Sequence, residues 1–152
     1  MNSFEISADP VDLGEFRRSL ADNACGALVI FEGWVRDHNE GRAVLHLAYE
    51  VHEPMALKEG QIILREAMDR FDIAHVRAIH RQGHLTLSEP AVVVGVSSAH
   101  RDAAFRACRY VIDEIKHRLP IWKKEFYADG SAEWVNCRQC VESRSSRDHA
   151  PA

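Results

Sequence analysis

The sequence has no run of apolar residues near the roughly 20 that cross a membrane, and residues 1–10 contain no basic segment followed by an apolar one. We therefore expect a cytoplasmic protein that does not contact membranes. It also has no large excess of either charge, since there are 19 Lys and Arg residues and 23 Asp and Glu residues, which gives a net charge of -4. A general attraction to nucleic acid is excluded, and any anion-binding site must be local.

Motifs for cofactors and metals are also missing. There is no glycine-rich phosphate loop, so a nucleotide cofactor has no support. His80 and His84 have a spacing that suits a metal only on a helix, and Gly83 between them indicates a strand instead. Cys137 and Cys140 form a single CxxC with no thioredoxin-like context, which favours bystander thiols. We predict neither metal nor cofactor.

The sequence does contain enough apolar residues for a substantial core. Hydrophobic residues make up 46% of 152 positions, the proportion of a soluble globular protein. We predict one domain over residues 1–141 and a disordered tail over 142–152, which is rich in serine and charge and has no apolar period. Cys25, at the start of an apolar run, and Cys108, on an apolar helix face, are interpreted as buried thiols.

Hydrophobic periodicity predicts three helices and six strands. Helical spacing appears over residues 9–22, 53–71 and 101–119, and the apolar stripes of the second and third include Met55 and Phe105. Strands are predicted over 27–35, 45–51, 73–81, 91–97, 121–127 and 132–137. In the strand over 45–51 apolar and polar residues alternate, which places Leu45 on the inner face and leaves the other face to solvent. The strand over 91–97 is apolar throughout, and Asp129-Gly130 marks a hairpin turn. Together these elements predict an α+β fold with a mixed, mainly antiparallel sheet and packed helices.

His100 and Arg101 follow a buried strand at the start of the third helix. Unpaired amide groups and the positive end of the helix dipole meet two basic side chains there, an arrangement that suits an anion. The alternative is an ordinary helix start with both side chains solvated.

Three lysines lie at or just after the end of the third helix. Lys116 borders the apolar stripe, so its stem should be partly buried. In the next strand, alternation sends Lys123 and Glu125 to one face and Trp122 and Lys124 to the other. A catalytic lysine needs desolvation or a nearby cation. If neither is present, Lys116 is an ordinary lysine whose stem is buried and whose amine reaches solvent. The strand with Lys123 and Lys124 is then a solvated edge strand whose lysines prevent pairing with another chain.

Four segments taken together resemble the large, catalytic subunit of molybdopterin synthase. Their order and spacing match, and the resemblance runs from about residue 26 to 134. The segments are Gly33-Trp34-Val35-Arg36, Ser98-Ala99-His100-Arg101, Ile115-Lys116-His117-Arg118 and Pro120-Ile121-Trp122-Lys123-Lys124-Glu125.

The resemblance implies an α/β-hammerhead fold and a homodimer that forms a heterotetramer with two small ubiquitin-like subunits. The implied reaction transfers sulfur from the C-terminal thiocarboxylate of the small subunit to cyclic pyranopterin monophosphate, giving the dithiolene of molybdopterin. Lys116 and Lys123 are the implied catalytic residues. The implied substrate-binding residues are Arg36, His100, Arg101, Lys124 and Glu125.

Two other functions remain open. A module that only binds a ubiquitin-like partner or a phosphorylated small molecule would keep Arg36, His100 and Arg101 but would not need both lysines. A thiol enzyme would depend on Cys137 and Cys140. The family resemblance also implies that a second subunit completes the pocket.

Overall fold

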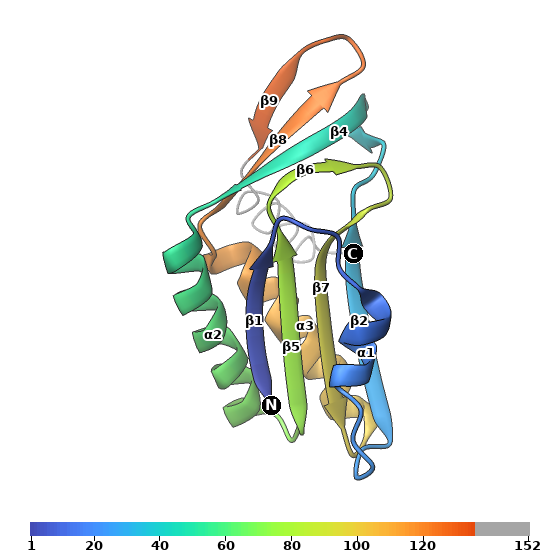
Figure 1. The fold of residues 1–152 in the computed structure, drawn as a ribbon, viewed down its shortest axis with the longest axis vertical. Helices are drawn as coiled ribbons and strands as arrows, with labels where there is room; N and C mark the ends of the chain where they lie inside the picture. Colours follow the sequence, from blue (N-terminus) through green and yellow to red (C-terminus); the bar gives the residue numbers. More distant parts are fainter. Residues whose placement is uncertain (136–152) are drawn as a thin grey trace, which may run out of the picture.

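The computed structural model describes residues 1–135 (Figure 1). The predicted tail, Cys137 and Cys140 lie outside the described residues, and the domain boundary at residue 141 stays a prediction. The helices are α1 (Leu13–Ser19), α2 (Glu53–Arg70) and α3 (Arg101–Arg118). The strands are β1 (Asn2–Ser7), β2 (Ala27–Trp34), β3 (His38–Asn39), β4 (Arg42–Val51), β5 (His75–Arg81), β6 (Gly83–Thr86), β7 (Pro90–Ser98), β8 (Ile121–Tyr127) and β9 (Ala132–Val135).

The first sheet has the strand order β1-β5-β7-β2, with β1 parallel to β5 and the other pairs antiparallel. Strand β7 is buried along nearly its whole length, as its apolar sequence predicts. Helices α2 and α3 cover one face of this sheet and the shorter α1 covers the other (Figure 1). On the α1 side, a Cβ added to Gly95 would stand 2.3 Å from the Leu20 side chain, so only glycine fits at this position of β7.

The second sheet is built around β4, which pairs with β6 and β8 and forms a tight hairpin with β3. Strand β9 joins its edge through the predicted Asp129-Gly130 turn, where Gly130 has a φ of +88°. This sheet crosses one end of the first sheet (Figure 1). The α+β prediction with a mixed, mainly antiparallel arrangement is confirmed.

Strands β1, β3 and β6 were not predicted. Strand β1 is held by tertiary contacts, because it pairs with β5 and sets Phe4 against α2 at Gly60. A Cβ at Gly60 would stand 2.3 Å from the Phe4 ring, which explains a glycine in the middle of a long helix. Strand β3 is only two residues long, and both His38 and Asn39 are polar, so no apolar alternation marks it.

The prediction that Leu45 lies on the inner face of its strand is wrong. The pairing of β4 with β8 shifts register between Val44 and His46, and Leu45 is 55% exposed. Such a shift reverses the alternation of the side chains on either side of it. Inner positions therefore include Val44 and Leu47, both of which are buried.

Three more predictions of burial are corrected. Met55 and Phe105, placed by periodicity on the inner stripes of α2 and α3, are 59% and 60% exposed. Each lies near the beginning of its helix, at the margin of the apolar stripe. Cys25 is only partly buried because it lies in the turn before β2, whereas Cys108 is buried as predicted. None of the helices in residues 1–135 is long and apolar enough to cross a bilayer.

Candidate active site

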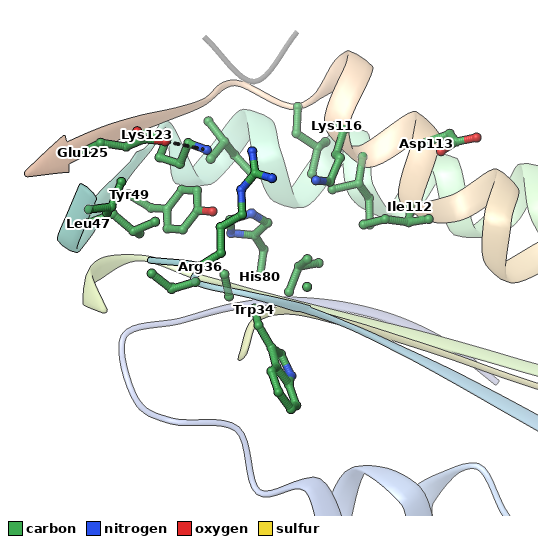
Figure 2. Close-up of a pocket in the computed structure, with 18 of the residues that line it drawn as sticks. Trp34, Arg36, Leu47, Tyr49, His80, Ile112, Asp113, Lys116, Lys123 and Glu125 are labelled. Atoms are coloured by element: carbon green, nitrogen blue, oxygen red, sulfur yellow. Dashed lines mark ion pairs between the residues drawn. The ribbon is translucent and has the colours of Figure 1, made fainter. Parts of the chain in front are cut away.

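A pocket of about 440 Å³ lies where the second sheet crosses the end of the first. The first sheet contributes the ends of β2 and β5 and the start of β7, the second contributes β4 and β8, and α3 contributes about its last three turns. Figure 2 shows Arg36, Lys116 and Lys123 entering this space from different elements, with the rings of Tyr49 and His80 beside Arg36. Three residues predicted from widely separated segments are thus brought together.

Arg36 reaches the pocket because the chain leaves β2 at Trp34 and turns across the end of the sheet. The intervening Val35 is buried, its amide donates to the Glu89 carbonyl at 3.1 Å, and this contact fixes the direction of the turn. The Arg36 guanidinium then donates to Asn39 Oδ1 at 3.4 Å. The Trp34 ring points away from the other labelled side chains (Figure 2).

Lys123 and Glu125 lie on the pocket side of β8, as alternation predicts, and form an ion pair of 3.1 Å. The Lys123 side chain is 20% exposed and that of Glu125 only 3%. Glu125 also accepts hydrogen bonds from Asn39 Nδ2 at 3.1 and 3.0 Å and from the Tyr127 hydroxyl at 3.0 Å. Burial acts to raise the pKa of Glu125, but Asn39, Lys123 and Tyr127 together hold it below its usual range.

Lys116 lies in the last turn of α3, one residue after the buried Ile115. It lines the pocket but is an exposed residue, so more solvent reaches it than reaches Lys123. A cation at this place is also favoured by the negative end of the helix dipole. The two lysines therefore reach one pocket in different environments.

His80 and Tyr49 belong to the pocket and were not predicted. Their rings meet edge to face, with centroids 4.9 Å apart. Burial lowers the pKa of His80 to about 4, the nearby Lys116 charge acts in the same direction, and the Arg81 carbonyl opposes both only in part. The sequence did carry a signal, because Val76, Ala78 and His80 alternate along β5 and a polar group ends the buried stripe.

Three predicted site residues do not line this pocket. His100 and Arg101 are exposed at the opposite end of α3, about 22 Å from Lys116 along a helix that rises 1.5 Å per residue. Lys124 projects from the other face of β8, where its Nζ lies 5.4 Å from the Phe126 ring centroid and 5.5 Å from that of Trp134. The alternation that brings Lys123 into the pocket turns Lys124 away from it.

The charges of the pocket suit an anionic ligand. Arg36, Arg109, Lys116 and Lys123 line it, and of its acidic residues Glu125 is already paired with Lys123. Arg109 forms a second ion pair of 2.9 Å with Asp113. Residues 1–135 contain no group of three or more His, Cys, Asp or Glu side chains placed to hold a metal ion.

Cysteine chemistry has little support in the described part of the chain. Burial raises the pKa of the Cys108 thiol to about 11, and its Sγ lies 3.8 Å from the Val94 carbonyl oxygen. The reactive thiolate is therefore scarce at neutral pH. Neither Cys108 nor Cys25 lines the pocket.

Comparison with known proteins decides the family. The family model described as MoaE protein matches residues 6–118. The chain belongs to the MoaE family. A MoaE relative from Culex quinquefasciatus, named molybdopterin synthase catalytic subunit, is 39% identical over 97% of this chain and 96% of its own length. One of the same name from a Nostoc strain is 39% identical over 93% and 87%.

Several solved structures share the fold of this chain. A molybdopterin synthase from Staphylococcus aureus superposes with a TM-score of 0.82 at 37% identity, over 87% of this chain and 96% of that one. A MoaE protein from Burkholderia ambifaria gives 0.80 at 31% identity over 99% and 100%. A chain from a Helicobacter pylori complex of subunits 1 and 2 of molybdopterin-converting factor gives 0.70 at 18% identity over 88% of each, which establishes a common fold.

Proposed function

We propose that this chain is the catalytic subunit of a molybdopterin synthase and acts as a sulfurtransferase. The observation that carries the proposal is the meeting of Arg36, Lys116 and Lys123 in one pocket. Nearly full-length relatives that bear the name of this catalytic subunit support it. The proposed substrate is cyclic pyranopterin monophosphate, and the proposed sulfur donor is the C-terminal thiocarboxylate of a small ubiquitin-like subunit.

The proposed ligands match the pocket in size and charge. A volume of about 440 Å³ lies in the usual range for small-molecule sites. The precursor carries a phosphate and the donor a thiocarboxylate, so two negative groups must be brought close together. Arg36, Lys116 and Lys123 would offset their repulsion, and a guanidinium such as that of Arg36 suits a phosphate.

The chemistry of the transfer explains the need for lysines. The thiocarboxylate sulfur bonds to a carbon of the pterin side chain while that carbon loses its bond to an oxygen, which departs on the phosphate as its ring opens or as water. Water then cleaves the acyl–sulfur bond, leaving the sulfur on the pterin and a carboxylate on the small subunit. Attack of water on the acyl carbon creates an oxyanion and releases a proton. Lys116 and Lys123 would stabilise that oxyanion and move protons. Two such transfers, from two donor molecules, supply both sulfurs of the dithiolene.

Glu125 is proposed to hold Lys123 rather than to touch the substrate. Its carboxylate is nearly inaccessible and already accepts hydrogen bonds from Asn39 and Tyr127 besides pairing with Lys123. A carboxylate that is fully engaged has little capacity for a ligand. Its negative charge would instead keep the Lys123 ammonium in place.

We further propose that His100 and Arg101 act in the pocket of a second copy. They are exposed and about 22 Å from Lys116 in their own chain, at 1.5 Å per helical residue. Two copies with antiparallel α3 helices would set the start of one helix beside the end of the other. Phe31 on β2, 37% exposed, and Phe105 on α3 supply apolar surface on that side. Such a homodimer, with a small subunit on each pocket, forms a heterotetramer.

The test is molybdopterin formation from cyclic pyranopterin monophosphate and a thiocarboxylated small subunit. We expect turnover by the wild type and its collapse in folded Lys116→Ala and Lys123→Ala variants. Lys58→Ala, which removes an exposed lysine of α2, is the matched control and should keep wild-type activity. Wild-type turnover that survives both changes would refute the lysine roles. Tight small-subunit binding without turnover would favour a binding module instead.

A further inference from the structure

His80 is the polar end of an otherwise apolar stripe. Val76 and Ala78 precede it on the same face of β5 and pack into the main core beneath α3. His80 itself is 6% exposed and lines the pocket. An apolar side chain would fill this place without the cost of burying two ring nitrogens. The histidine therefore calls for an explanation in terms of its polar atoms.

One ring nitrogen has its role fixed by the backbone. His80 Nδ1 lies 2.7 Å from the Arg81 carbonyl oxygen. A carbonyl oxygen can only accept, so Nδ1 must carry the proton and donate to it. In the neutral ring, Nε2 is then left without a proton and is a hydrogen-bond acceptor.

The ring is held both neutral and in a fixed orientation. Burial lowers the pKa of His80 to about 4, so the imidazole is uncharged at neutral pH. The Tyr49 ring meets it edge to face at an interplanar angle of 87°. A neutral Nε2 in a fixed place is thus a permanent feature of the pocket.

Most of the charged groups that line the pocket either only donate or already have a partner. Arg36 and Lys123 bring only donors, the Glu125 carboxylate is engaged by Asn39, Tyr127 and Lys123, and the Asp113 carboxylate is paired with Arg109. The charge of Lys116 is close enough to act on the titration of His80. Figure 2 shows both side chains extending into the same space from opposite walls.

We propose that His80 is a positioning residue for Lys116, whose ammonium group it draws into the pocket by accepting a hydrogen bond at Nε2. The inference rests on the proposed function and adds a residue to it. A lysine has a flexible four-carbon stem, and an acceptor of fixed position reduces the number of places its amine visits. Because the ring is neutral, it orients the ammonium without adding another positive charge.

Two substitutions of His80 distinguish the role of Nδ1 from that of Nε2. His80→Asn keeps a donor near the Arg81 carbonyl but removes the acceptor at the position of Nε2. His80→Gln extends an amide oxygen to about that position and so restores an acceptor. His117→Asn makes the same change at an exposed position of α3 and is the matched control. Turnover is measured with saturating small subunit across precursor concentrations, and circular dichroism and thermal unfolding establish that each variant is folded.

We expect His80→Asn to lower kcat about tenfold with KM within about twofold, and His80→Gln to recover most of the loss. Wild-type kcat in His80→Asn would overturn the inference. So would equal losses in both variants, which would indicate packing, or a rise in KM alone, which would indicate contact with the ligand. Absence of turnover in the wild type would instead overturn the proposed function, and this inference with it.

Discussion

The side-chain amide of Asn39 donates to both carboxylate oxygens of Glu125, at 3.1 and 3.0 Å, and so joins the segment after β2 to strand β8. The same residue accepts from Arg36 through Oδ1. Asn39 thus links the substrate-binding arginine proposed here to the carboxylate that pairs with Lys123. A single amide therefore connects Arg36, in the segment between β2 and β3, to the Lys123–Glu125 pair on β8.

Replacing Asn39 by Ala removes these contacts and leaves Glu125 with fewer donors. We expect a loss of about 1–3 kcal/mol in the free energy of unfolding, measured by urea denaturation, because a buried charged acceptor loses its partner. We also expect lower turnover through misplacement of Arg36 and Lys123. Asn23→Ala, at an exposed position, is the control. Unchanged stability and turnover in the Asn39 variant would show that water replaces the amide without cost.

Lys123 and Lys124 make a matched pair for testing the pocket. Both lie on β8 with similar exposure, but only Lys123 lines the pocket. We expect Lys123→Ala to reduce kcat by at least about 100-fold, the usual scale for a group that stabilises charge in a transition state. Lys124→Ala should keep kcat within about threefold, as expected for a small loss of surface interaction. Equal losses would mean that Lys124 takes part in binding, as the family resemblance implies.

The burial of His80 makes stability depend on pH in a defined window. Its folded pKa of about 4 lies below the unfolded value of 6.5, so the unfolded chain binds more protons between these values. The stabilisation is complete above about pH 6.5 and is lost as the pH falls toward 4. By pH 5 the loss due to this residue should be about 2 kcal/mol, measured as the difference in urea unfolding between pH 7 and 5. The His80→Gln variant should lack this part of the difference, whereas an unchanged difference would contradict the assignment.

Mixing two inactive variants tests whether a second copy completes the pocket. In a mixed dimer of His100→Ala and Lys123→Ala, one pocket has both defects and the other has none, if His100 acts across the interface. Random exchange should then restore about a quarter of the wild-type pockets. If both residues served the same chain, each pocket would keep one defect and mixing would restore nothing. Turnover before and after subunit exchange is the measurement, with each variant alone as the control.

The long periodic helices and strands were predictable from the sequence, and so was the side of β8 that faces the pocket. The predictions for α2, α3 and β8 agree with the structure to within a residue at each end, because their patterns span several turns or alternations. Alternation alone placed Lys123 and Glu125 together. Leu45 and Phe105 were misplaced because a strand irregularity and the margin of a helix face are set by neighbouring elements.

The remaining site residues depended on contacts that no local pattern records. Asn39 and Glu125 are 86 positions apart, and their hydrogen bonds exist only because the second sheet folds across the first. Strand β1 depends in the same way on the packing of the Phe4 ring against Gly60 of α2. His80 could have been singled out as a polar residue ending an apolar stripe, but its partners could not. The sequence reveals which residues are unusual more readily than which ones meet.

The crossing of the two sheets also determines when, during folding, a working site can exist. The first sheet and α3 are complete by residue 118, where the match to the family model also ends, whereas Lys123 and Glu125 arrive on β8. A chain stopped at residue 118 would contain Arg36, His80 and Lys116 but only part of the wall around them. During synthesis on the ribosome, the strand that carries Lys123 and Glu125 is therefore the last part of the site to be made, after most of the fold has been synthesised.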